Sequence, residues 1–159
     1  MIPLEFPKYP LRLKSRENKT LVFDVIRKKY VPLQPEEWVR QHCLHFLISE
    51  KKYPAGWIQV ERQLKVEGLS KRLDIAVCRP DGSIQLLVEC KAPEVVIDQN
   101  VFDQIARYNW EARAELLMVT NGLAHFYCRM DYRRKAYEFM RELPEFEPPG
   151  QGGRNCPGE

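Results

Sequence analysis

Three charged residues in the middle of the chain have the types and the spacing of a catalytic cluster. Glu89 and Lys91 follow the apolar run Leu86–Val88. Because they are two apart in an expected strand, their side chains project from the same face. Asp74 lies in the preceding expected strand, where its carboxylate can face them across a hairpin. Charges at the end of an apolar strand are costly when they are buried without partners, so we expect these three side chains to meet.

Such a cluster would suit hydrolysis of a phosphate ester. Two converging carboxylates bind a hard divalent cation, and the backbone carbonyl of Cys90 would be a further ligand. Lys91 beside the cation would hold and orient a water molecule for attack on phosphorus, which is metal-assisted phosphodiester hydrolysis. The same residues also fit an ordinary ion pair at a strand end, with Asp74 exposed at a sheet edge, because short motifs of this kind occur by chance.

Apolar patterns predict the elements that would position the cluster. We expect strands at residues 20–26, 57–66, 72–78, 83–90, 116–120 and 123–128, and helices at 35–52, 98–114 and 131–142. Pro35 followed by two glutamates is typical of a helix start, and Asp98 is a suitable N-cap. The order predicts an α/β domain with a mixed central sheet of about five strands flanked by helices.

Length and composition are those of one globular domain. The chain has 159 residues, a hydrophobic fraction of 44% and a net charge of +3. We expect an extended basic arm at residues 1–18, the domain at 19–143 and a disordered tail rich in proline and glycine at 144–159. The odd count of five cysteines and the absence of a leader-like start indicate reduced thiols in a cytoplasmic protein. No apolar stretch reaches the length of a membrane span.

Several segments together resemble the nuclease core of the PD-(D/E)XK superfamily, and more narrowly the N-terminal domain of the type I restriction enzyme R subunit. The resemblance covers roughly residues 20–130. The matching segments are Trp38-Val-Arg-Gln41, Arg72-Leu-Asp-Ile-Ala-Val77, Leu86-Leu-Val-Glu-Cys-Lys-Ala-Pro93, Gln104-Ile-Ala-Arg-Tyr108 and Val119-Thr-Asn-Gly122. Leu73 stands where the superfamily's name has a proline.

The resemblance implies a restriction-endonuclease-like fold and a DNA endonuclease that uses Mg²⁺, with Mn²⁺ as a substitute, in restriction or repair. Asp74 and Glu89 would be the metal ligands and Lys91 the catalytic lysine. Gln104 and Tyr108, four apart on one helical face, would contact DNA phosphate or brace the site. The implied partners are DNA, a motor or specificity subunit, and a second copy of the chain.

Other questions stay open at the level of the sequence. The acid that the first helix would contribute is Glu36 or Glu37; we favour Glu37, with Gln41 as another candidate one turn on. Either acid also suits the positive end of the helix dipole. Three basic clusters, at residues 12–16, 27–29 and 129–135, could follow a DNA backbone or be ordinary solvated surface. A non-cleaving nucleic-acid-binding module, or a partner subunit with a vestigial site, is the alternative function.

Overall fold

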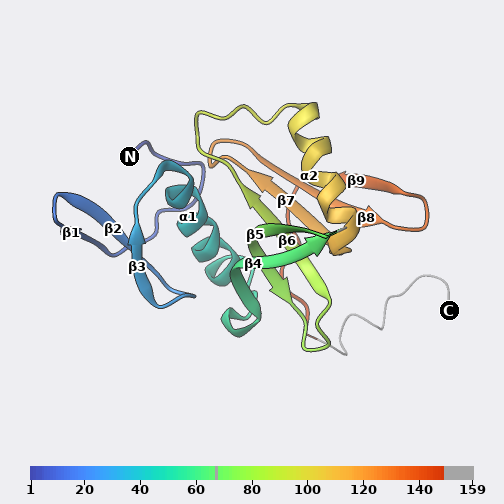
Figure 1. The fold of residues 1–159 in the computed structure, drawn as a ribbon, viewed down its shortest axis with the longest axis horizontal. Helices are drawn as coiled ribbons and strands as arrows, with labels where there is room; N and C mark the ends of the chain where they lie inside the picture. Colours follow the sequence, from blue (N-terminus) through green and yellow to red (C-terminus); the bar gives the residue numbers. More distant parts are fainter. Residues whose placement is uncertain (67, 149–159) are drawn as a thin grey trace.

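The computed structural model describes residues 1–66 and 68–148 (Figure 1). Nine strands, two α-helices and one 3₁₀ turn are assigned there. In chain order they are β1 (Leu13–Arg16), β2 (Lys19–Asp24), β3 (Lys29–Pro32), α1 (Pro35–Ser49), η1 (Ala55–Trp57), β4 (Ile58–Val66), β5 (Leu69–Cys78), β6 (Ile84–Cys90), α2 (Gln99–Ala112), β7 (Leu116–Thr120), β8 (His125–Asp131) and β9 (Ala136–Met140).

The central sheet has the strand order β4-β5-β6-β7-β8-β9, which confirms the mixed α/β fold with one strand more than expected. The β6–β7 pair is parallel and the other neighbours are antiparallel. Helix α1 covers one face of the sheet and α2 covers the other (Figure 1). Strand β6 is therefore buried on both faces, as its almost continuous apolar sequence predicts.

A second, three-stranded antiparallel sheet (β1-β2-β3) lies on the far side of α1 from the central sheet (Figure 1). The expected boundary of a basic arm at residue 18 is therefore wrong, since it falls in the turn between β1 and β2. Residues before β1 are also packed. The backbone N–H of Glu5 donates to the carbonyl of Gly122 at 2.7 Å, and Leu4 and Phe6 contact the core on the α1 side.

The helix expected at residues 131–142 is wrong, because this segment forms the β8–β9 hairpin. The Asp131 carboxylate accepts hydrogen bonds from the backbone N–H groups of Arg133 and Arg134, which stabilises a turn. Beyond the turn, Tyr137 and Phe139 lie with ring centroids 5.3 and 5.0 Å from that of Phe102 in α2. Packing of alternate aromatic side chains thus outweighs the helical tendency of the arginine-rich stretch.

Part of the expected disordered tail, residues 144–159, is packed. Phe146 packs edge-on against Trp57, with ring centroids 5.1 Å apart, and its backbone N–H donates to the carbonyl of Lys51 at 2.7 Å. The rest of the expected tail, residues 149–159, lies outside the described residues. In the described part of the chain, no helix is long and apolar enough to cross a membrane.

Candidate active site

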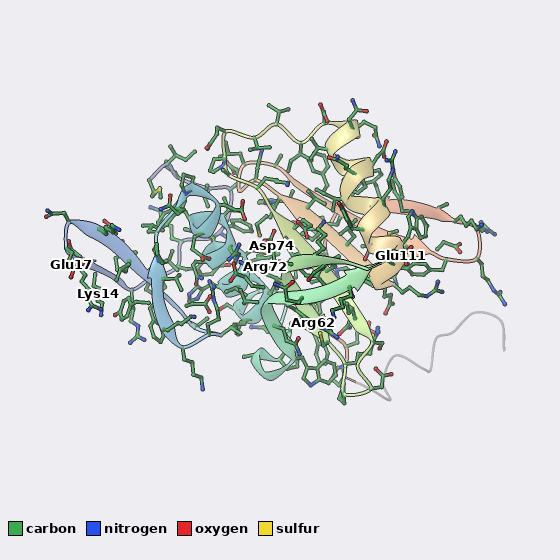
Figure 2. The ribbon with its side chains drawn as sticks, in the orientation of Figure 1. Lys14, Glu17, Arg62, Arg72, Asp74 and Glu111 are labelled. Atoms are coloured by element: carbon green, nitrogen blue, oxygen red, sulfur yellow. The ribbon has the colours of Figure 1, made fainter. Side chains whose placement is uncertain are left out.

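The structure brings Asp74, Glu89 and Lys91 together where β5 and β6 separate, in the middle of β5 and at the end of β6. Backbone pairing between these strands stops at Ile75 and Val88. One residue further on, Asp74 Oδ2 accepts the backbone N–H of Cys90 at 2.8 Å. Asp74 therefore lies between the separating strand ends, on the side of β5 that faces α1 (Figure 2).

Glu89 is a buried carboxyl with an unused oxygen. The residue is 6% exposed, and Oε1 accepts no hydrogen bond from any described residue. Burial, followed by the negative charge of Asp74, raises the pKa of Glu89 to about 8, although the charges of Lys71 and Lys91 act in the opposite direction. The two carboxyl groups are close enough for a hydrogen bond between them to contribute to this shift in pKa.

Lys91 directly follows β6 and belongs to the same group of charges. Its backbone N–H donates to the carbonyl of Thr120 at 2.8 Å, which continues the pairing of β6 with β7. Its ammonium charge opposes the rise in the pKa of both Glu89 and Glu36 but does not cancel it. Among the residues that the structure describes, no carboxylate lies within 4.0 Å of its Nζ, so the half-buried side chain has no fixed ion-pair partner.

The two glutamates at the start of α1 have different surroundings. Glu37 accepts hydrogen bonds from Arg27 at 2.8 Å and from Arg40 at 3.3 Å, so it belongs to an ion-pair network. Burial, and then the charge of Asp74, raises the pKa of Glu36. Glu36 also accepts a hydrogen bond from Arg40 at 3.3 Å. Since Arg40 contacts Glu37 and Asp74 as well, both glutamates border the site, and a catalytic role of Glu37 stays a prediction.

Gln41 is a supporting residue of that network. It is fully buried, and its amide donates to Asp24 Oδ2 at 2.9 Å and to Glu37 Oε2 at 3.2 Å. Asp24 also accepts the backbone N–H of Arg27 and its guanidinium, at 2.7 Å each. Burial alone would raise the pKa of Asp24, but these hydrogen bonds outweigh it and hold the pKa below its usual value. Gln41 is thus not placed to touch DNA.

Lys71 is a residue of this site that the sequence patterns did not reveal. Its Nζ lies 3.9 Å from Glu89 Oε1 and 3.5 Å from the centroid of the Tyr108 ring. Tyr108 is 44% exposed, so it braces Lys71 at the surface and is not a core residue. Gln104 is exposed one turn earlier on α2. No local signal marks Lys71, because its role depends on a contact with a helix that lies 37 residues later in the sequence.

The donors fit a hard divalent cation that keeps part of its water shell. Glu89 Oε1 is buried and accepts no hydrogen bond from the described residues, and Asp74 adds a second carboxylate beside it. Within residues 1–66 and 68–148, no group of three or more His, Cys, Asp or Glu side chains is arranged to hold a metal ion. Two carboxylates are nevertheless sufficient for Mg²⁺, which is commonly held by one or two carboxylates together with water and substrate phosphate.

Residues 35–144, which contain this whole group, match the family described as type I restriction enzyme R protein N terminus (HSDR_N). The chain belongs to this family. The family that the sequence motifs suggested is thus confirmed.

Among solved structures, the chain is similar to a fragment assigned as the HsdR subunit of a type I restriction enzyme from Vibrio vulnificus YJ016. The identity is 20% and the TM-score 0.41, over 66% of this chain and 23% of that one. The HSDR_N chain described here thus spans about a quarter of the length of that structure. No curated protein matches the chain described here.

Proposed function

We propose that the chain is a Mg²⁺-dependent DNA endonuclease domain of the PD-(D/E)XK type, which hydrolyses phosphodiester bonds in restriction or repair. The observation that carries this proposal is the carboxyl pair formed by the buried Glu89, whose Oε1 accepts no hydrogen bond, and the partly buried Asp74. A bound cation would offset the burial and the repulsion by Asp74 that raise the pKa of Glu89. An ordinary ion pair at a strand end has no need of a second carboxyl group beside a buried one.

Asp74, Glu89 and the carbonyl oxygen of Cys90 would hold the ion, which supplies Lewis-acid catalysis at the phosphate when it is bound. Lys91, which has no fixed partner among the described residues, donates a hydrogen bond to the attacking water and stabilises negative charge that develops on the phosphate oxygens. A bond forms between the water oxygen and phosphorus while the ester P–O bond breaks, and the proton that the water loses passes through solvent to the leaving oxygen. Lys71 and Tyr108 contact the phosphate on the α2 side.

The proposed partners follow from the family. DNA is the substrate, and a motor or specificity subunit of a type I system is the natural neighbour of an R-protein N terminus. One such site cuts one strand, so double-strand cleavage requires a second copy of the chain or another nuclease.

A second candidate function is a DNA-binding or partner subunit with a vestigial site. This second function is favoured because a cationic side chain of the protein lies near each carboxylate. Arg40 lies 3.2 Å from Asp74, and Lys71 lies 3.9 Å from Glu89. These pairs would stabilise the acids without any metal.

Cleavage of supercoiled plasmid and linear duplex DNA, with and without Mg²⁺, tests the proposal. The wild type and Glu111→Gln, a matched change of an exposed glutamate on α2 (Figure 2), are expected to cleave only with Mg²⁺. Glu89→Gln is expected to be inactive. Cleavage by Glu89→Gln at the wild-type rate would refute the site, and an inactive wild type on duplex, single-stranded and branched DNA would favour the vestigial function.

A further inference from the structure

The outer face of the β1-β2-β3 sheet carries exposed cations and aromatic rings, and it lies outside the residues that match the family. Strand pairing puts these side chains on one side, while Val22 and Val31 are buried on the other. We call this surface the basic face. It consists of Arg12, Lys14, Arg16, Lys19, Phe23 and Tyr30.

Two of the cations are held over the rings. The Arg12 guanidinium lies 3.8 Å from the centroid of Phe23, and Lys14 Nζ lies 4.2 Å from that of Tyr30. The two rings pack edge to face at 5.3 Å. Contacts of this kind order the long side chains in advance, so less conformational entropy is lost when a ligand binds.

The charges of the basic face are not neutralised by the protein. None of its four cations lies within 4.0 Å of a carboxylate among the described residues. In contrast, Arg27 and Arg40 behind the sheet each contact several acids. A face with four such positive charges, against the single acid Glu17 of the β1–β2 turn, is complementary to a polyanion.

The basic face is also fixed relative to the candidate active site. Arg27, which follows β2, donates to Glu37 at 2.8 Å and to Glu61 at 3.1 Å. Arg40 in turn lies 3.3 Å from Glu61 and 3.2 Å from Asp74. Two arginines and shared acids therefore connect the small sheet with Asp74 in β5, and Lys14 lies on the hairpin that projects beyond α1 (Figure 2).

We propose that the basic face binds the sugar-phosphate backbone of duplex DNA beside the bond that is cut. The inference rests on the proposed nuclease function, to which it adds a substrate-holding surface. Phosphate contacts by Arg12, Lys14, Arg16 and Lys19 bind without reading sequence. Phe23 and Tyr30 are already covered by cations, so their faces are not open for the base stacking that holds single strands.

The test compares two triple variants with equal loss of charge. One is Arg12→Gln, Lys14→Gln and Arg16→Gln on the basic face, and the other is Arg133→Gln, Arg134→Gln and Lys135→Gln at the exposed β8–β9 turn. Binding of a short fluorescent duplex is measured by anisotropy over a range of NaCl concentrations. EDTA is present, so that no cleavage takes place, and thermal unfolding verifies that both variants are folded.

We expect the basic-face variant to bind at least about tenfold more weakly at low salt, and its slope of log K against log salt to fall by about 3. The β8–β9 variant should stay close to wild type. Equal weakening of both variants, no effect of the basic-face variant, or no binding by wild type would overturn the inference. A loss confined to single-stranded DNA would overturn the assignment to duplex.

Failure of this inference and failure of the nuclease proposal can be told apart. Binding is measured without metal. A loss of DNA binding that is confined to the basic-face variant would therefore support this inference even if wild type never cleaves. Cleavage that depends on Glu89, together with unchanged DNA binding by the basic-face variant, would refute only the proposed role of the basic face.

Discussion

The Asp74 carboxylate accepts the backbone N–H of Cys90 at 2.8 Å, at the point where β5 and β6 separate. A side chain thus replaces the next backbone hydrogen bond of the hairpin. Because Cys90 lies between Glu89 and Lys91, this one contact also fixes the strand end that carries both of them. The other oxygen of Asp74 faces Arg40 at 3.2 Å, so Asp74 joins the sheet end to α1.

Asp74→Ala is expected to lower the free energy of unfolding by about 1–3 kcal/mol, because it leaves a backbone donor without its acceptor. Asp74→Asn keeps an acceptor oxygen and should cost less, although both variants should lose Mg²⁺ affinity. Urea unfolding and calorimetric titration with Mg²⁺ measure the two effects. Equal destabilisation by both substitutions would show that the contact with Arg40, and not that with Cys90, dominates.

Lys91→Ala should abolish cleavage but leave Mg²⁺ and DNA affinity almost unchanged, because the lysine acts on the attacking water and on charge in the transition state. Loss of one such electrostatic contact is worth on the order of 3 kcal/mol, or roughly a hundredfold in rate. Single-turnover cleavage and Mg²⁺ titration provide the measurements, with Lys135→Ala as the exposed control. Cleavage that survives Lys91→Ala would place the catalytic site elsewhere.

Glu89 is expected to make the metal-free protein less stable as the pH rises from about 4.5 to about 8. Its pKa in the folded protein is raised to about 8, so between these values the folded state holds a proton that the unfolded state has released. Glu89→Gln mimics the protonated form. At pH 9 it should melt roughly 2–8 °C above wild type, for a relief on the order of 1–2 kcal/mol. A wild-type melting temperature that rises over this range in step with the variant would contradict the buried acid.

Lys71→Met removes the cation that faces Glu89 in the absence of metal. Near pH 9 the variant should be less stable than wild type by on the order of 1 kcal/mol, and saturating Mg²⁺ should reduce the difference because the ion takes over the neutralisation. Arg72→Met, at a neighbouring exposed position, is the control. Melting temperatures with Mg²⁺ and with EDTA decide the outcome. A difference in stability between variant and wild type that does not change with Mg²⁺ would show that Lys71 does not act at the metal site.

Asp24→Ala should be the most destabilising of these substitutions, at about 3–5 kcal/mol, because it removes the fully buried carboxylate that Arg27 and Gln41 share and leaves each with Glu37 as a remaining partner in the network. The pKa of Asp24 is lowered in the folded state, so its contribution is present at neutral pH. The contribution is lost as the pH falls below the ordinary aspartate value of 3.8 towards the folded pKa. Urea unfolding between pH 7 and pH 3 measures it. A variant as stable as wild type at pH 7 would show that the network is dispensable.

Local sequence was sufficient to locate most strands and both helices, and to place Glu89 at the end of β6 with Lys91 directly after it. Strand alternation and helix starts depend on residues only a few positions apart, and apolar periodicity records them directly. The same local reasoning failed at β9, where the contact of Tyr137 and Phe139 with Phe102 of α2 decides the structure.

The sequence by itself placed Asp74 and Glu89 in two neighbouring strands and Lys91 directly after the second. Only the tertiary structure decided which further charges join them. Glu36 and Glu37 are adjacent and equally suited to a helix start. Glu37 belongs to an ion-pair network because Arg27, ten residues earlier in the sequence, donates a hydrogen bond to it. Lys71 reaches Glu89 only because Tyr108 supports it from another helix. Electrostatic partners are set by distance in space, which no short sequence pattern encodes.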